Sequence, residues 1–238
     1  MEIEEFKNFL ESKKNENKIK TKINMEKAYT FMKNTLEWNE KINLTNIKEE
    51  KEFIVKHIID SLTITRYLED NKKLIDIGTG GGFPGIPIKL CFNNMKETLI
   101  DSVGKKINIV KDNIEKLELN NIEAIHIRSE QLAKNIEYRE KFDYATTRAV
   151  SNLSTISEYM LPFLKIGGKA ICMKGPNYEE ELKEAKKAIE VLGGTIEKIE
   201  NIKLDNEYER NIIIIKKIKS TPSKYPRDNG KPLKNPIK

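Results

Sequence analysis

The sequence predicts an α/β protein: a mostly parallel sheet of seven strands with an antiparallel last strand, preceded by a helical segment. Three observations lead to this prediction. Residues 1–70 carry apolar side chains at helical spacing and contain no strand-like run. From Leu74 onward, short apolar runs alternate with helical stretches, as in a parallel sheet covered on both faces. The last two strand-like runs are joined by a link too short for a parallel crossover.

The helical segment comes first. Two groups of apolar residues fall near the i, i+3, i+4 spacing of a helix that buries one face. These are Ala28, Phe31, Met32, Leu36 and Trp38, followed by Phe53, Ile54, His57, Ile58 and Leu62. We expect residues 1–70 to form a helical N-terminal extension.

The strand-like runs define a core that we place at residues 71–218. The runs expected to pair in parallel are 74–77, 98–101, 122–127, 142–147 and 169–173, and the clearest helix between such runs covers 179–192. The runs 195–204 and 210–218 should pair antiparallel. This order describes the Rossmann-like fold of the class I S-adenosylmethionine-dependent methyltransferases better than a plain dinucleotide-binding sheet.

Composition narrows the class of protein. The chain has 238 residues, of which 38% are hydrophobic, and only two cysteines, Cys91 and Cys172, which stand apart. Two isolated cysteines exclude a disulfide scaffold and a zinc cluster. No purely apolar run is longer than Ile212–Ile215, which is far too short to span a bilayer. The N-terminus, MEIEEFKNFL, has no apolar signal segment. We expect a cytoplasmic monomer without metal or membrane association.

The net charge of +6 is concentrated in the tail. Residues 216–238 hold eight Lys or Arg and one Asp, which leaves residues 1–215 almost neutral. Basic tails with Pro, Gly and Tyr often contact phosphates, and poorly ordered solubilising tails have the same composition. We treat 219–238 as a basic C-terminal tail and expect it to bind RNA backbone.

A glycine-rich loop follows the first predicted strand. It reads Asp-Ile-Gly-Thr-Gly-Gly-Gly-Phe-Pro-Gly over residues 76–85. Glycines at this place allow positive φ and let the backbone approach a ligand. Four glycines in five residues exceed what a plain turn needs. The loop therefore indicates a ligand site.

The class of ligand can be inferred from the cofactor-binding motifs that the loop does not match. The nicotinamide fingerprint G-x-G-x-x-G starts at Gly78, but its third glycine is replaced by Phe83. No phosphate loop of the type G-x-x-x-x-G-K-[ST] is present. Asp101 ends the second predicted strand, where an acidic residue bonds ribose hydroxyls; it would also serve as a helix cap there. An adenosine cofactor without pyrophosphate fits best, namely S-adenosylmethionine.

The acceptor can be narrowed by exclusion. Methyl transfer to cytosine C5 needs a nucleophilic cysteine, but Cys91 and Cys172 lie in apolar stretches. Exocyclic amines are usually methylated with a diproline loop after the fourth strand, and residues 146–150 contain no proline. A ring nitrogen such as guanine N7 carries a lone pair and no proton, so it needs no general base. We expect neither His57 nor His126 to face the cofactor.

At this point the chain resembles the bacterial small-subunit rRNA guanine-N7 methyltransferases of the RsmG (GidB) family, nearly from end to end. The resemblance rests on an ordered set of motifs: Trp38-Asn39-x-x-Ile42-Asn43-Leu44-Thr45, His57-x-x-Asp60-Ser61-Leu62, the glycine loop from Asp76 to Pro87, Asp101-Ser102-x-x-Lys105-Lys106, Arg128-Ser129-Glu130, Thr147-Arg148-Ala149-Val150, Lys174-Gly175 and Thr221-Pro222-x-x-Tyr225-Pro226-Arg227-x-x-Gly230-x-Pro232.

The resemblance implies a set of cofactor-binding residues: Gly78, Phe83, Asp101, Ser129, Glu130 and Arg148. Asp101 would bind the ribose, Ser129 and Glu130 the adenine edge, and Arg148 a carboxylate or phosphate. A structural ion pair is the alternative role of Arg148. Lys174 and Arg227 would contact RNA, with a solvated loop position as the alternative for Lys174, and no catalytic residue is assigned.

The expected function is methylation of N7 of a guanine in 16S rRNA, in the loop near the decoding site, with 16S rRNA or a small-subunit precursor as partner. Three alternatives remain open. The protein could be a methyltransferase that acts on another RNA, a small molecule or a protein. It could be a non-enzymatic rRNA-binding protein. The third alternative is a nicotinamide oxidoreductase, which Phe83 and the terminal strand pair disfavour.

Overall fold

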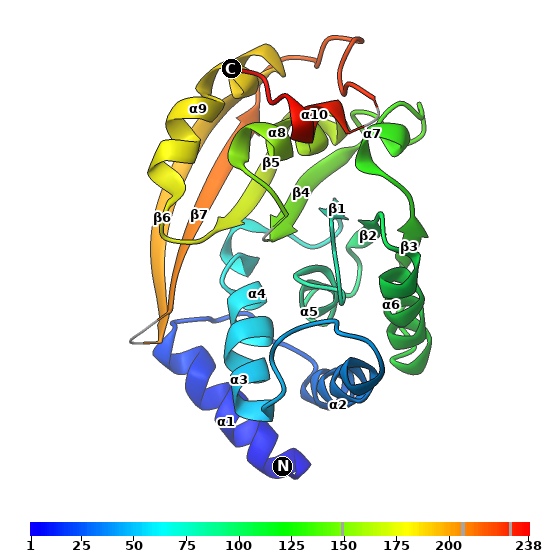
Figure 1. The fold of residues 1–238 in the computed structure, drawn as a ribbon. Coiled ribbons are helices and arrows are strands. Elements are labelled where there is room, and N and C mark those ends of the chain that lie inside the picture. The colour runs from blue at the N-terminus through cyan, green and yellow to red at the C-terminus, as the bar shows by residue number, and fades with distance from the viewer. Residues whose placement is uncertain (149, 206–207, 229) are drawn as a thin grey trace.

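The computed structural model describes residues 1–148, 150–205, 208–228 and 230–238. Within these residues, seven strands form a sheet in the order β3-β2-β1-β4-β5-β7-β6 (Figure 1). The strands are β1 (Lys73–Ile77), β2 (Lys96–Asp101), β3 (Ile122–His126), β4 (Phe142–Arg148), β5 (Leu164–Lys174), β6 (Gly194–Asp205) and β7 (Tyr208–Lys217).

The pairing of the strands confirms the predicted architecture. Strands β1 to β5 pair in parallel, whereas β7 runs antiparallel to both β5 and β6. The run Ile212–Ile215 is apolar throughout because β7 is covered on both faces: Ile212 and Ile214 belong to one core cluster, Ile213 and Ile215 to the other. Asn206 and Glu207 of the predicted link lie outside the described residues.

Helices cover the two faces of the sheet. Over one face lie α7 (Ser129–Leu132), α8 (Leu153–Met160), the short η3 (Leu161–Phe163) and α9 (Tyr178–Val191). Over the other lie α5 (Gly85–Lys89) and α6 (Gly104–Lys116). The helix predicted at 179–192 corresponds to α9, whose apolar stripe Ala185, Ala188 and Ile189 is buried. None of the described helices combines the length and the apolar character that crossing a membrane requires.

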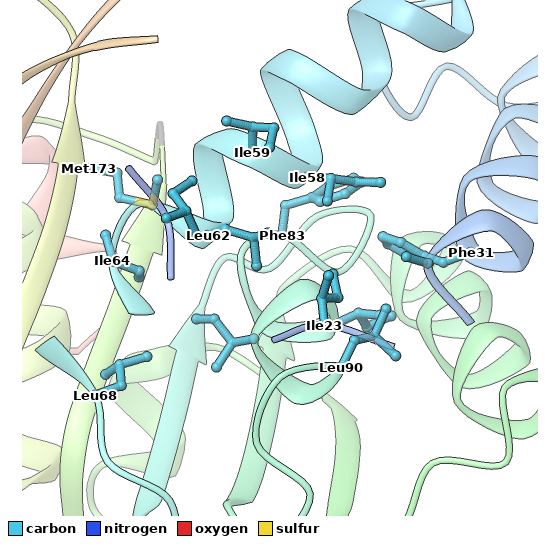
Figure 2. Packing of buried hydrophobic residues seen from close by; sticks show 14 of the residues in the cluster. Ile23, Phe31, Ile58, Ile59, Leu62, Ile64, Leu68, Phe83, Leu90 and Met173 are labelled. Atoms are coloured by element: carbon cyan, nitrogen blue, oxygen red, sulfur yellow. The ribbon is translucent and has the colours of Figure 1, made fainter. Parts of the chain in front are cut away.

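The N-terminal region is helical, as predicted. It contains α1 (Ile3–Glu16), α2 (Met25–Lys41), a continuous helix made of α3 (Glu50–Phe53), the π-helical turn η1 (Ile54–Ile59) and α4 (Asp60–Leu62), and finally η2 (Thr65–Tyr67). Its apolar side chains share a core with the α5–α6 face of the sheet. Figure 2 shows Phe31 and Ile58 from this region around Phe83 of the glycine loop. The division into 1–70, 71–218 and 219–238 remains a prediction.

The C-terminal tail folds back onto the core of the molecule. It carries α10 (Lys231–Lys234), which packs beside α8 (Figure 1). Thr221 is buried, and its hydroxyl donates to the Leu192 carbonyl at 2.7 Å. Two carbonyls of the segment, those of Thr221 and Tyr225, each accept a hydrogen bond of 2.9 Å from the Arg139 guanidinium. The described part of the tail is therefore bound to the core by specific contacts.

Candidate active site

A cavity of about 520 Å³ opens at the carboxyl ends of β1, β2 and β4. The strand order reverses between β1 and β4, and ligands of open α/β sheets bind at such a reversal. The wall combines residues of the glycine loop, the ends of β2 and β4, the start of α7 and the N-terminal region. The sequence thus brings its predicted loop to the position where this type of sheet binds ligands.

Asp76, near the end of β1, holds the glycine loop through its side chain. Its carboxylate is fully buried and accepts hydrogen bonds from the Thr79 hydroxyl at 2.7 Å, the Gly85 amide at 3.2 Å and the Thr146 hydroxyl at 3.0 Å. Burial raises the pKa of Asp76 to about 6. The residue spans both ends of the loop and one neighbouring strand, so it holds the loop in one conformation.

The loop and the end of β2 meet through Asp101. The Gly80 amide donates to one carboxylate oxygen of Asp101 and the Val103 amide to the other, both at 2.9 Å. Gly78 and Gly80 have φ values of +69° and +58°, which L side chains rarely adopt. Asp101 lines the cavity, and its contact with the Val103 amide closes a turn before α6. The alternative role as a helix cap is wrong, because α6 has Val103 as its N-cap residue, without a side-chain cap.

The opposite end of the cavity is formed by residues after β3 and from α8. Ser129 and Glu130 are buried and line this end, together with Tyr159. The Ser129 hydroxyl donates to the Tyr159 carbonyl at 2.8 Å. One carboxylate oxygen of Glu130 accepts a hydrogen bond from the Gly230 amide at 3.3 Å. Glu130 therefore connects the cavity to the tail.

Arg148 lies at the loop end of the cavity and is held on several sides. Its guanidinium donates to the buried Asp60 carboxylate at 3.1 Å, to the Lys56 carbonyl at 3.0 Å and to Nδ1 of His57 at 2.9 Å. Its Cζ lies 4.9 Å from the centre of the Phe83 ring. Arg148 thus forms the structural ion pair considered from sequence and also lines the cavity. Its contact with a carboxylate or phosphate of a ligand remains a prediction. Ala149, next in this motif, lies outside the described residues.

His57 faces the cavity, and the expectation that neither histidine would do so is wrong. The imidazole stacks on Phe83 with a centroid distance of 4.3 Å. Burial, aided by the Arg148 charge, lowers the pKa of His57 to about 3. The ring is therefore neutral. Its Nδ1 accepts from Arg148, so the proton on Nε2 is donated to the Thr45 hydroxyl at 2.9 Å.

Thr45 and Leu44 also line the cavity, and sequence patterns did not assign them a role. Their loop is held by Asn39, whose side-chain oxygen accepts from the amides of Leu44 at 2.8 Å and Thr45 at 2.9 Å. A polar Asn-Leu-Thr segment directly after a helix was the available signal. Periodicity could not show that it lies over the sheet edge.

The two predicted RNA contacts lie outside the cavity wall. The Lys174 ammonium donates to the Ser151 carbonyl at 2.7 Å and pairs with Glu181 at 2.6 Å. The Arg227 guanidinium pairs with the buried Glu158 carboxylate at 2.7 Å. Both side chains have intramolecular partners, and contact with RNA through them remains a prediction. In the described part of the chain, no group of three or more His, Cys, Asp or Glu side chains is placed to hold a metal ion.

The sheet order, the glycine loop after β1 and the acidic residue at the end of β2 together define a class I methyltransferase. The solved structure of TYW2 from M. jannaschii in complex with AdoMet shares this fold, with a TM-score of 0.55 and 16% identity over 68% of this chain and 76% of that chain. The family described as rRNA small subunit methyltransferase G (GidB) matches residues 24–213. The chain belongs to this family.

Individual relatives agree with the family match. The ribosomal RNA small subunit methyltransferase G of Clostridium novyi is 49% identical over 204 residues, covering 84% of each chain. That of Clostridium botulinum strain Loch Maree is 47% identical over 240 residues, covering 98% of this chain and all of the relative. The similarity thus includes the N-terminal helices and the tail.

Proposed function

We propose that this protein transfers the methyl group of S-adenosylmethionine to N7 of a guanine in 16S rRNA, in the loop near the decoding site. One observation carries the proposal: the glycine loop and the Asp101 carboxylate meet in one cavity at the sheet reversal. Family membership supports the substrate. We further expect the protein to act in the cytoplasm, as a monomer and without a metal ion.

The residues of the cavity fit the cofactor. Asp101 retains lone pairs on both carboxylate oxygens beside its two backbone donors, so it can accept from ribose hydroxyls. A Cβ on Gly78 would lie 2.5 Å from Cγ2 of Val150, which is closer than two carbon atoms can pack. This part of the cavity wall therefore has no room for a side chain at Gly78. Ser129 and Glu130 would contact the adenine edge. Arg148, beside Phe83, would face the methionine carboxylate.

The bound cofactor supplies an activated methyl group on a sulfonium, and the protein supplies position. Bringing a nucleophile into line at contact distance can account for most of the acceleration. His57 cannot act as a general base, because both ring nitrogens already have partners and its pKa lies far below neutrality. Cys172 is buried, and burial raises the pKa of its thiol to about 12. An acceptor with a free lone pair, such as guanine N7, needs neither group.

Two basic side chains at the cavity support an RNA substrate. Lys106 and Arg128 both line it, and Arg128 is exposed. Neither forms an ion pair with another described residue. Unpaired cations beside a methyl-transfer site are suited to phosphate groups that flank a target base.

The proposal is tested by methyl transfer from labelled S-adenosylmethionine to small ribosomal subunits from a strain lacking this gene. We expect label in 16S rRNA and none in large subunits treated in parallel. Label in large-subunit RNA, in protein or in small molecules instead would overturn the substrate. Absence of cofactor binding would overturn the reaction itself.

A further inference from the structure

We propose that Leu233 of α10 closes the adenine end of the cofactor cavity, so that the C-terminal segment is part of the cofactor site. The inference rests on the proposed function, because it takes the adenine ring of S-adenosylmethionine as the ligand. It assigns to the tail a role other than the RNA contact that its charge suggests.

The first argument is position. Leu233 lines the same cavity as Asp101, Ser129 and Glu130, although more than a hundred residues separate it from them. In Figure 1, α10 (red) lies next to α7 and α8, which supply Glu130 and Tyr159. The Gly230 amide bonds Glu130. The tail therefore reaches the end of the cavity assigned to adenine.

The second argument is fixation. The Pro232 carbonyl, directly before Leu233, accepts a 3.0 Å hydrogen bond from the Thr155 hydroxyl, and Pro232 is buried. The Ile237 carbonyl accepts a 2.6 Å bond from the Ser154 hydroxyl. On the other side, Arg227 is paired with buried Glu158. Contacts before and after Leu233 thus hold α10 at the cavity.

The third argument is exposure. Leu233 is 58% exposed although the backbone around it is held in place. Of the seven large apolar side chains that are exposed in the described part of the chain, three line this cavity: Leu233, Val103 at 44% and Val150 at 39%. Exposed apolar side chains gathered at one cavity indicate an apolar ligand surface.

The chemistry of adenine fits this surface. The ring has two apolar faces and a polar edge, so a site needs apolar side chains for the faces and hydrogen-bonding groups for the edge. Val103 lies two residues after the end of β2 and Leu233 comes from the tail, while Ser129 and Glu130 lie after β3. Leu233 and Val103 would cover the ring faces, and the polar pair would meet its edge.

The test is the affinity of Leu233→Ala for S-adenosylhomocysteine and for adenosine, measured by isothermal titration calorimetry. Loss of the apolar contact should weaken both ligands about five- to tenfold. Leu233→Met should retain near wild-type affinity, because it keeps an apolar side chain of similar size. Ile218→Ala is the matched control: Ile218 is 51% exposed and does not line the cavity, so affinity should not change.

A second readout follows the segment itself. Hydrogen exchange of residues 230–236 should slow when S-adenosylhomocysteine binds to the wild-type protein, and should slow less in Leu233→Ala. Unchanged affinity of Leu233→Ala, together with unchanged exchange on binding, would overturn this inference while leaving the proposed function intact. If the wild-type protein bound neither ligand, the proposed function itself would fail.

Discussion

Arg148 shows how one residue can serve the fold and the site together. Its guanidinium is fixed by Asp60, the Lys56 carbonyl and His57, and it lies over Phe83 at the cavity wall. The Lys56 carbonyl and the His57 ring are supplied by the π-helical turn η1, a feature that often occurs at functional sites. The cation at the loop end of the cavity is therefore positioned by the N-terminal region.

Asp60 should be critical for stability. Its buried carboxylate pairs with both Arg148 at 3.1 Å and Arg210 at 3.0 Å, so Asp60→Ala would leave two largely buried cations without their anion. We expect the free energy of unfolding to fall by about 3–5 kcal/mol. Urea unfolding followed by the fluorescence of Trp38 measures this.

The control for that variant is Glu37→Ala. Glu37 pairs with Lys41 on an exposed helix surface, where solvent screens the two charges, so its loss should change the free energy of unfolding little. Equal effects of the two substitutions would contradict the assignment of Asp60 as the shared anion of the buried pair.

His57 should make stability fall at mildly acidic pH. Its pKa is about 3 in the folded protein and about 6.5 in the unfolded chain, so below pH 6.5 only the unfolded chain takes up the proton. Stability is therefore lost as pH falls, by about 1.4 kcal/mol between pH 7.5 and pH 5.5. His57→Asn retains an acceptor for Arg148 and removes the titration. Asp76, whose raised pKa acts in the opposite direction, titrates in both proteins, so denaturant unfolding at both pH values should show a pH dependence that differs by this amount between the wild-type protein and the variant. Identical pH dependence of the two proteins would contradict the neutral, buried ring.

At the scale of elements, the glycine loop depends on both neighbouring strands. Asp76 of β1 bonds the loop through Thr79 and is itself held by the Thr146 hydroxyl of β4. Asp101 of β2 bonds the loop through the Gly80 amide. Phe83, the departure from the nicotinamide fingerprint, packs at centroid distances of 5.2 Å from Phe31 and 5.6 Å from Phe53. A bulky side chain is accommodated there because the N-terminal helices surround it (Figure 2).

Gly78→Ala should damage the cofactor site more than the fold. The substitution combines a φ of +69° with a Cβ only 2.5 Å from Cγ2 of Val150. We expect at least a tenfold loss of affinity for S-adenosylhomocysteine by calorimetry and a stability loss of about 1–2 kcal/mol.

Gly167→Ala separates the two causes. Gly167 also has a positive φ, +90°, but no atom lies within 4 Å of a Cβ built there, and it does not line the cavity. It should lower stability by a similar amount and leave cofactor affinity unchanged. A comparable loss of affinity in both variants would show that Gly78 acts through the fold alone.

At the scale of the whole molecule, the sheet could be predicted because its strands are short apolar runs between helical stretches. The antiparallel pair followed from the length of one link. The start of β5 at Leu164 was missed, since Gly167 and Gly168 separate Leu164 and Ile166 from the apolar run that begins at Ala170. The tail was harder still: its charge suggests RNA, whereas its anchoring depends on partners such as Arg139 and Glu158, which are distant in sequence.

The candidate site divides in the same way. Local signals marked the glycine loop and Asp101, because a strand followed by glycines or by an acidic residue has a fixed place in this type of sheet. His57, Thr45 and Leu233 reach the cavity only through long-range packing, which periodicity does not report.

The measurement that tests the central claim most directly is the identity of the methylated nucleoside. Small subunits from a strain lacking this gene would be incubated with the protein and labelled S-adenosylmethionine, and the 16S rRNA digested to nucleosides for mass spectrometry. Family membership predicts N7-methylguanosine as the labelled product, and this acceptor needs neither a protonatable His57 nor a reactive Cys172. Label on an exocyclic amine or on cytosine C5 would contradict the account.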